Sequence, residues 1–238
     1  MMKKIYTLLA LCALMASCQS ETSTDAKEPK INTETDSVSV LKDTLVLEEP
    51  EAEVADFTKI EHYAALDTKA KLVENFGKEN IKDGSTWYGE GSTELKHSVL
   101  TNPSNGHIVK YVWKEENPTQ LSFIEIFGIL RNKDYEAIGT QKIGSECGIF
   151  TGMTLKEMRD WNGEDFEFSG FGWDFGGMVR YTEESNFAKC NLSLRLEIKF
   201  EEGKNQYDAL YGDTDLFADA TIKLGAPITL DQLTLFVD

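Results

Sequence analysis

The sequence predicts an α+β fold built as a tandem pseudo-repeat, in which each unit is a short helix followed by antiparallel strands. Apolar residues alternate with polar residues from Leu192 to Phe200, which is the period of a half-buried strand. Thr154, with Glu157 three residues later, forms a capping-box pattern that opens a helix. A pattern of glycines with one tryptophan recurs at an offset of 86 residues.

The first twenty residues, MMKKIYTLLALCALMASCQS, have the composition of a secretory signal. Two lysines precede a mostly apolar run from Ile5 to Met15, and small residues follow it. About eleven helical residues reach only ~17 Å, whereas the hydrocarbon core of a bilayer is ~30 Å thick. We therefore expect this segment to direct export and not to span the membrane.

Residues 14–18, LMASC, resemble the lipobox of bacterial lipoproteins. The resemblance implies removal of a signal peptide of residues 1–17, a thioether-linked diacylglycerol on Cys18, and acylation of the new amino terminus with a chain such as palmitate. Two or three acyl chains anchor a protein stably. We therefore expect a lipid-anchored protein of the cell envelope, at the outer membrane, on either its periplasmic or its surface side. An ordinary secreted chain would instead leave Cys18 as a free thiol.

Residues 18–56 are expected to form a disordered acidic tether behind the acylated cysteine. From Gln19 to Asp56 the chain has no aromatic residue, and eleven acidic residues stand against three lysines, a net charge of −8. Two triplets, DSV and DTL, resemble acceptor sites of periplasmic O-glycosylation, which implies modification of Ser37 and Thr44. Both triplets also fit plain tether sequence, because three-residue motifs recur by chance.

Residues 57–238 carry nineteen basic and thirty acidic residues, a net charge of −11. This balance argues against a nucleic-acid partner, whose phosphates require clustered Lys and Arg. It also disfavours contact with anionic lipid headgroups, so the acyl chains on Cys18 are expected to provide the membrane attachment. The length is sufficient for one core, or for two small half-domains that share one.

Two units, residues 57–143 and 144–238, follow from the internal repeat. Four residues of the first unit recur 86 positions later: Gly77, Gly84, Trp87 and Gly91 match Gly163, Gly170, Trp173 and Gly177. In the first unit we expect a helix at DTKAKLVENFG and strands at HIVKYVWK and LSFIEIFGIL. In the second we expect a helix from Thr154 to Trp161, short strands around Phe166 and Met178, and the long strand Leu192–Phe200.

The segment GEDFEFSGFGWDFGG, residues 163–177, holds five glycines and five aromatic rings. Glycine serves positions of positive φ or of close approach, so tight turns with the rings in the core are the favoured interpretation, Trp87 and Trp173 included. The other interpretation is a ring platform that binds a small ligand or glycan, with Phe171 and Phe175 as its exposed members.

Residues 152–158, GMTLKEM, with Asn162-Gly163, are similar to the tandem modules of the beta-lactamase inhibitor protein and of the small outer-membrane assembly lipoproteins of the SmpA/OmlA type. The resemblance covers about 25 residues of each unit. It implies that the sheet following the helix is a protein-binding surface. The mature domain also resembles bacterial lipoproteins that carry a GFGWD segment, which implies no activity.

The sequence predicts no catalytic residue, metal site or cofactor. The three histidines, His62, His97 and His107, lack the spacing of metal ligands, and no nucleophile elbow, dinucleotide loop or calcium loop is complete. We therefore expect a non-catalytic protein-interaction module with an unidentified protein partner; a small-ligand binder and an enzyme remain the alternatives. The residues expected on the interaction surface are Phe171, Arg195, Glu197 and Lys199.

Cys147 and Cys190 are the two cysteines of the mature domain apart from the lipidated Cys18. Export places them in a compartment that permits disulfides. The sequence alone leaves two possibilities open, a Cys147–Cys190 bridge or two buried thiols.

Overall fold

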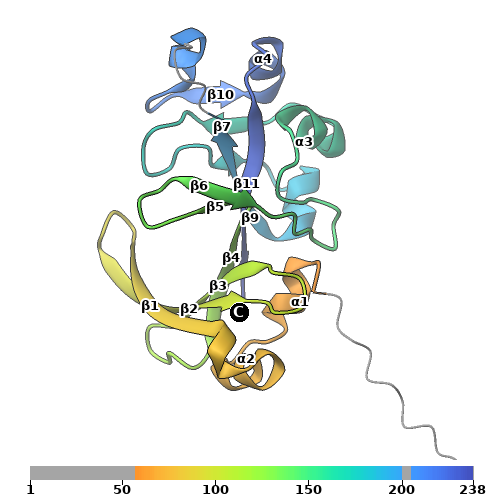
Figure 1. Ribbon diagram of the computed structural model, residues 1–238. Helices are drawn as coiled ribbons and strands as arrows, with labels where there is room; N and C mark the ends of the chain where they lie inside the picture. Colours follow the sequence, from red (N-terminus) through yellow and green to blue (C-terminus); the bar gives the residue numbers. More distant parts are fainter. Residues whose placement is uncertain (1–56, 200–204, 238) are drawn as a thin grey trace, which may run out of the picture. The chain divides into compact units, whose positions relative to one another are not determined.

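The computed structural model describes residues 57–199 and 205–237, all within one compact unit, Ala52–Asp238. The expected lipid site Cys18 and the expected glycosylation sites Ser37 and Thr44 lie outside the described residues. The fold is α+β, with mostly antiparallel sheets and few helices (Figure 1). The elements in chain order are α1 (Ile60–Ala64), α2 (Lys69–Phe76), β1 (Ile81–Tyr88), β2 (Thr93–Thr101), β3 (Ile108–Trp113), β4 (Leu121–Phe127), β5 (Ile129–Arg131), β6 (Ala137–Thr140), α3 (Leu155–Asn162), β7 (Glu167–Ser169), β8 (Val179–Arg180), β9 (Leu192–Ile198), β10 (Asp215–Phe217), α4 (Ala218–Lys223) and β11 (Ile228–Phe236).

The main sheet has six strands in the order β1-β2-β3-β4-β11-β9, and all its pairs are antiparallel. Strand β11 comes last in the chain but lies between β4 and β9, so the sheet continues across the unit boundary expected at residue 143. Two smaller sheets, β10-β7-β8 and the hairpin β5–β6, accompany it. The strands expected near residues 107–114, 121–130 and 192–200 are confirmed as β3, β4 with β5, and β9.

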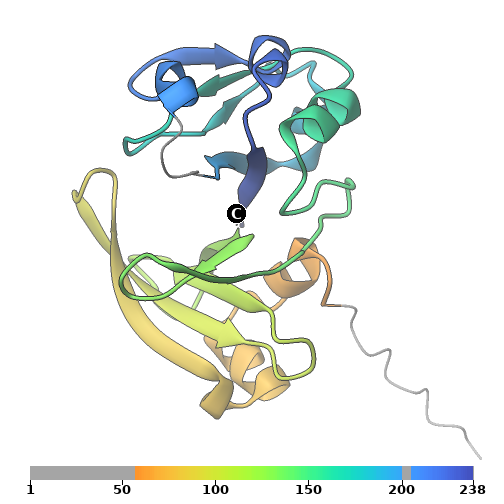
Figure 2. The same cartoon turned by 45° about the horizontal axis from the view of Figure 1, so that its top comes forward.

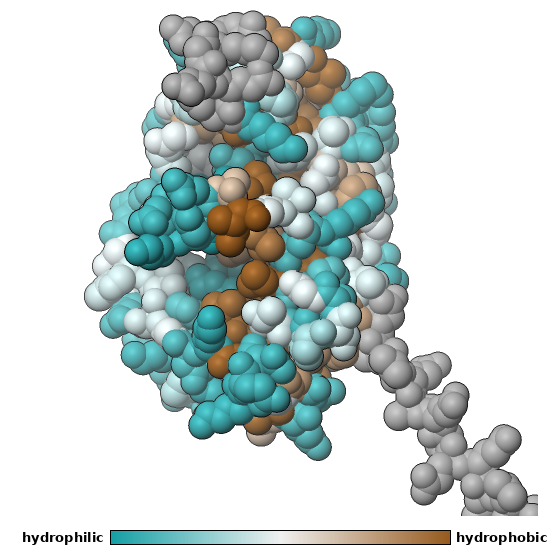
Figure 3. Space-filling view, in the orientation of Figure 1, coloured by the Kyte–Doolittle hydropathy of each residue, from teal (hydrophilic) through white to brown (hydrophobic). Residues whose placement is uncertain are grey.

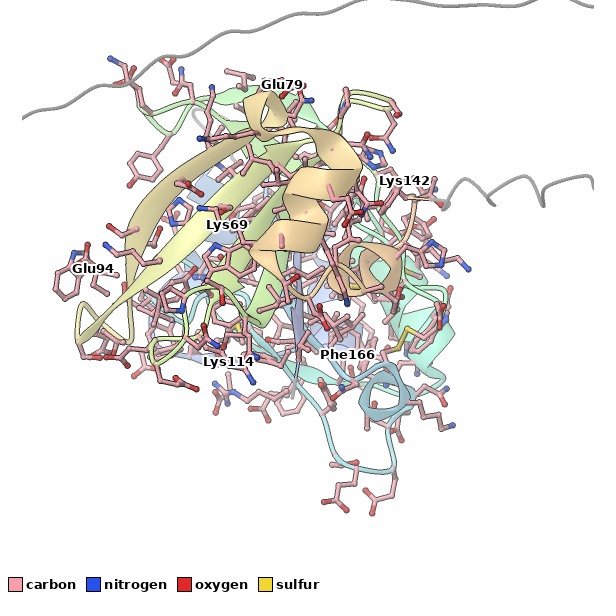
Figure 4. The ribbon with its side chains drawn as sticks, turned by 90° about the horizontal axis from the view of Figure 1, so that it is seen from below. Lys69, Glu79, Glu94, Lys114, Lys142 and Phe166 are labelled. Atoms are coloured by element: carbon pink, nitrogen blue, oxygen red, sulfur yellow. A yellow bond between two sulfur atoms is a disulfide. The ribbon has the colours of Figure 1, made fainter. Side chains whose placement is uncertain are left out.

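Helices cover one face of the main sheet, and the hydrophobic core lies between them and the sheet. The side chains of β9 alternate between buried and half-buried along its whole length, as predicted. From α1, Ile60 and Tyr63 are fully buried, and the carbonyl of Tyr63 accepts a hydrogen bond from the Tyr111 hydroxyl of β3 at 3.0 Å. Seen from below, α2 lies across the sheet and Glu94 marks the far end of the β1–β2 hairpin (Figure 4).

The sheet curls toward its other face, as shown by contacts on that face between strands that are not neighbours. The hydroxyl of Tyr88 on β1 donates to Glu125 on β4 at 2.8 Å, although β2 and β3 lie between these strands. Lys110 of β3 lies 3.0 Å from the same carboxylate, and the Gln232 amide of β11 donates to it at 3.1 Å. This polar network holds the curl, which Figure 2 shows as the bending of β1 and β2.

Helices α2 and α3 lie 86 residues apart, and each follows a threonine N-cap and is followed by a glycine of positive φ. The hydroxyl of Thr68 accepts a hydrogen bond from the Lys71 amide, and Thr154 forms the predicted capping box with Glu157. After the helices the two units differ: β1 has eight residues, whereas β7 has three. The structure therefore does not confirm the tandem repeat.

The repeated tryptophans do not have equivalent environments. Trp87 lies on β1 with 60% of its surface exposed, so its expected place in the core is wrong. Trp173 is half-buried in a loop, where its indole N–H donates to the Gly170 carbonyl at 2.7 Å. Equal spacing in the sequence therefore did not give equal packing. In the first unit the chain continues as strand β1 through Trp87, whereas in the second unit strand β7 ends at Ser169 and Trp173 lies in the loop that follows.

Most rings of residues 163–177 are packed in the core. Phe166, Phe168 and Phe171 are buried, whereas Phe175 is exposed. Phe171 is only 4% exposed, so the expectation that it supplies an exposed binding anchor is wrong. Gly177 is required by close packing: its φ is 76°, and a Cβ there would lie 2.0 Å from the Leu196 carbonyl oxygen of β9.

Cys147 and Cys190 are joined by a disulfide, which is drawn in yellow in Figure 4. Their Cα atoms are 5.5 Å apart, and the two residues lie 43 positions apart in the sequence. The bridge ties the loop ahead of α3 to the short 3₁₀ helix Asn186–Cys190, which leads into β9.

Reduction of this disulfide is expected to destabilise the fold. With a separation of 43 positions between the cysteines, the chain-entropy model gives a loss of about 3 to 4 kcal/mol in the free energy of unfolding. Urea unfolding with and without reductant measures it, and the Cys147→Ala/Cys190→Ala variant should show no response to reductant. If a thiol reagent labels both Cys147 and Cys190 in the unfolded, unreduced protein, the bridge is contradicted.

Candidate functional site

A groove lies on the curled face of the sheet, beside the hairpin β5–β6. We call it the hairpin groove; its volume is about 610 Å³. Its lining residues include Ile108, Phe127, Leu130, Tyr135, Ile138, Arg131, Arg195, Glu197 and Asp231. They come from β3, β4, β5, β6, β9 and β11 and from the turn of the hairpin. In Figure 3 a strip of hydrophobic residues runs from the hairpin toward β3 and β4, and the surface is hollowed beside it.

The rim of the groove carries two exposed apolar side chains from the hairpin. Tyr135, in the turn, is 85% exposed, and Ile138, on β6, is 64% exposed. The side chain of Asn132 fixes the turn by accepting hydrogen bonds from the amides of Asp134 and Glu136. Tyr135 has a φ of 62°, a left-handed conformation that Gly or Asn adopts at lower steric cost.

On the floor of the groove the carboxylates of Asp231 and Glu197 lie near the guanidinium of Arg131. Asp231 occupies a β-bulge of β11, and one of its oxygens accepts a hydrogen bond from the Ile129 amide at 2.6 Å. The Arg131 guanidinium lies 3.5 Å from the other oxygen of Asp231 and 3.8 Å from the carboxylate of Glu197. Asp231 therefore fixes the hairpin to the sheet, and Arg131 is shared between two acids.

Burial raises the pKa of both carboxyl groups above their usual values. For Asp231 burial is the main cause, opposed by the Ile129 hydrogen bond and by Arg131. For Glu197 burial again dominates, and the neighbouring charge of Asp231 raises the pKa further, while Arg131 lowers it. The groove therefore holds negative charge in an environment that solvates it poorly.

The structure brings together two of the four residues expected on the interaction surface. Arg195 and Glu197 both line the hairpin groove. The guanidinium of Arg195, however, donates to the backbone carbonyls of Gly176 and Asp174 at 2.7 and 2.8 Å, so it fastens the loop 170–177 to β9. Lys199 is exposed but lies outside this groove, and Phe171 is in the core.

Sequence reasoning missed Arg131, Tyr135, Ile138 and Asp231. Two signals were present. Asp231 interrupts the apolar run ITLDQLTLF, and a charged residue at such a position marks a bulge or a site. Tyr135 and Ile138 stand in a turn-forming polar stretch, RNKDYEAIG, where large apolar side chains have no core to fill.

Within residues 57–199 and 205–237, no group of three or more His, Cys, Asp or Glu side chains is placed to hold a metal ion. Each histidine has another role. His62 lies 3.8 Å from Glu146, His97 is hydrogen-bonded to Thr86, and His107 is hydrogen-bonded to Tyr63. No helix in the described part of the chain has the length and apolar character needed to cross a bilayer.

The raised pKa of Glu197 predicts a pH-dependent stability difference. The carboxyl ionises at lower pH in the unfolded chain than in the folded one, so the folded state loses stability as the pH rises between the two pKa values. The Glu197→Gln variant lacks this loss, so its stability relative to that of the native chain should increase between about pH 4 and about pH 7. Urea midpoints at both values measure it, with exposed Glu183→Gln as the control. A native chain whose stability relative to that of Glu197→Gln increases over this rise in pH would contradict the prediction.

No protein-family model, curated protein or solved structure matches this chain.

Proposed function

We propose that this protein is a lipid-anchored, non-catalytic binding module of the cell envelope, and that a protein partner docks in the hairpin groove. The signal sequence and lipobox support the anchor, and the acidic stretch between Cys18 and the domain supports a tether of some reach. The observation that carries the proposal is Tyr135, a bulky ring held in solvent at the rim of the groove.

The conformation of Tyr135 supports a role other than folding. A tyrosine at φ 62° costs more than a glycine or asparagine at the same place, and an 85% exposed ring contributes almost nothing to the core. Exposed tyrosines that neighbour an apolar groove are frequent anchors of protein interfaces. The strain and the exposure are both explained if the ring packs against a partner.

The form of the groove favours a protein over a small molecule. Its volume of about 610 Å³ lies in the range of ligand pockets, but the groove is open along its rim, and its apolar side chains come from a protruding hairpin. The alternative, a ligand bound by the rings of residues 163–177, has lost three of its five rings to the core, Phe166, Phe168 and Phe171.

We further propose that the two units arose by tandem duplication. The supporting observations are the equal offset of α2 and α3, their threonine N-caps, and the glycines of positive φ that end them, Gly77 and Gly163. Strands β1 and β7 also begin 86 residues apart. On this view the first unit extended its hairpin, and the second replaced it with the loop 170–177.

Acid–base catalysis is a second candidate function, favoured by the convergence of Glu197 and Asp231 in one groove with raised pKa values. Against it, Arg131 lies between the two carboxylates and Asp231 already holds the Ile129 amide. Hydrolysis of chromogenic glycosides that Glu197→Gln abolishes would establish this function; the absence of turnover by the native chain would exclude glycoside hydrolysis.

The rim residues are expected to determine partner binding. Tyr135→Asn with Ile138→Thr keeps the turn and strand preferences but removes both apolar side chains, so recovery of the partner in cell crosslinking should fall strongly. The thermal midpoint should not fall, since both side chains are exposed and asparagine adopts the left-handed conformation of residue 135 at lower cost. Trp87→Thr removes another exposed ring, which lies outside the groove, and is the matched control. Unchanged recovery with the rim variant would contradict the proposed function.

Cys18→Ser is expected to release the protein from membranes, because both the acyl attachment site and the processing signal depend on the cysteine. Cell fractionation followed by detergent partitioning measures the release. The Cys147→Ala/Cys190→Ala variant controls for a general effect of removing cysteines and should stay membrane-bound. A Cys18→Ser chain that still enters the detergent phase would refute the lipid anchor.

A further inference from the structure

The two edges of the main sheet differ in how they are covered. Along the outer edge of β9, the Leu196 amide donates to the Gly177 carbonyl at 2.8 Å. The Tyr181 hydroxyl donates to the Leu192 carbonyl of the same edge, also at 2.8 Å. At the opposite edge, β1 extends over eight residues, and no strand or isolated bridge of the described residues pairs with its outer side. Because every second residue of β1 exchanges hydrogen bonds with β2, the backbone groups of the others point to this open edge.

Strand β1 lacks most of the features that protect exposed edges in other sheets. It contains no proline, and it pairs with β2 without a bulge through all eight residues. The carboxylate of Asp83 is bound inside the chain, by Lys69 at 2.6 Å and by the Ser98 hydroxyl at 2.6 Å. Lys82 is the other charged residue of the strand. One lysine is therefore the remaining charge that could keep another strand away.

The face of β1 that carries Asp83 also carries Ile81 and Trp87, because side chains alternate along a strand. The ring of Trp87 is 60% exposed. Ile81, at the other end of the strand, is half-buried and packs against the core with the part that is covered. The open edge thus has an exposed ring at one end and a partly covered aliphatic side chain at the other.

We propose that β1 pairs with β1 of a second copy of this chain, antiparallel about a two-fold axis at Gly84, so that two main sheets become one. Residues directly opposite in such a pair share a face, so Ile81 of each copy contacts Trp87 of the other. The symmetry repeats this contact at both ends of the interface. Lys82 then lies opposite Thr86, and no two like charges are opposed.

The residues of β1 are self-complementary in this register alone. An axis at Asp83 would oppose two aspartates, and an axis at Lys82 would oppose two lysines; both arrangements are destabilising. An axis at Ser85 would place an aspartate opposite each tryptophan. The helices do not obstruct the pairing, because the sheet curls toward its other face and the α2 helices of the two copies therefore diverge from the axis.

The charge of the domain distinguishes a second copy from a basic partner segment at the same edge. The net charge of −11 over residues 57–238 makes two copies repel each other at long range. Strand β1 itself is neutral, with one lysine and one aspartate. Salt screens the long-range repulsion, so pairing of two copies should strengthen with salt, whereas binding of a basic segment to the acidic domain should weaken.

Sedimentation equilibrium of the full chain in density-matched detergent measures the self-association. We expect a monomer–dimer equilibrium in which the dimer is favoured more at about 0.5 M than at about 0.05 M sodium chloride. Trp87→Thr removes the ring but keeps a good strand former, so the dimer should weaken at least about tenfold. Tyr135→Asn with Ile138→Thr, which changes exposed side chains away from β1, is the matched control and should dimerise like the native chain.

A charge exchange tests the register. Thr86→Lys opposes two lysines twice in each dimer and should weaken it about tenfold. Lys82→Glu added to Thr86→Lys opposes a carboxylate to each new ammonium and should restore the native affinity. The rescue is specific to pairing between copies, because residues four positions apart on one strand lie about 13 Å from each other. Thermal midpoints of both variants, which share the loss of the threonine, verify that each is folded.

Three results would each overturn the inference: a native chain that stays monomeric up to about 1 mM at both salt concentrations, a Trp87→Thr chain that dimerises as tightly as the native one, or no rescue of Thr86→Lys by Lys82→Glu. A native dimer that weakens as salt is added would also contradict pairing of two acidic copies. A monomeric chain that crosslinks to a different protein through residue 87 would show that the edge takes another partner. The proposed function is tested separately, since no residue of β1 lines the hairpin groove.

Discussion

The pairing of β11 on both of its edges is the constraint on which the rest of the structure depends. One edge pairs with β4 from Gln232 to Phe236, and the other pairs with β9 from Ile228 to Leu235. Without this strand the sheet would separate into four strands and an isolated β9. The strand also supplies Gln232 to the Glu125 network that holds the curl, and Asp231 to the groove. Fold and candidate site therefore share one element.

The bulge at Asp231 shows how a local irregularity produces a site. In a regular strand this residue would pair with a residue of β9, but the register of β11 and β9 shifts between Leu230 and Gln232. The bulge frees the carboxylate to accept the Ile129 amide, and the backbone carbonyl of Asp231 accepts from Gly128. The hairpin β5–β6 is held over the sheet by these bonds, and the groove is the space that results.

Local patterns in the sequence predicted the elements whose causes are local. The capping box at Thr154 and the alternation of β9 depend on residues within a few positions, and both are found as expected. The environments of Trp87 and Phe171 depend on where the chain goes next. Phe171 is buried because the loop 170–177 folds back onto Tyr211 and Leu210. No periodicity of the sequence predicts this contact. The groove has the same origin, since Ile129 and Asp231 are 102 residues apart.

The position of β11 also sets an order of events for folding. It is the last strand of the described chain, yet it fills the middle of the sheet. A nascent chain that ends before Ile228 can form β1 to β4, but the edge of β4 then has no partner, and exposed edges recruit other extended chains. Completion of the sheet requires contacts of long sequence separation, which form slowly. Until β11 has been made and has paired, the edge of β4 therefore remains open to association with another chain.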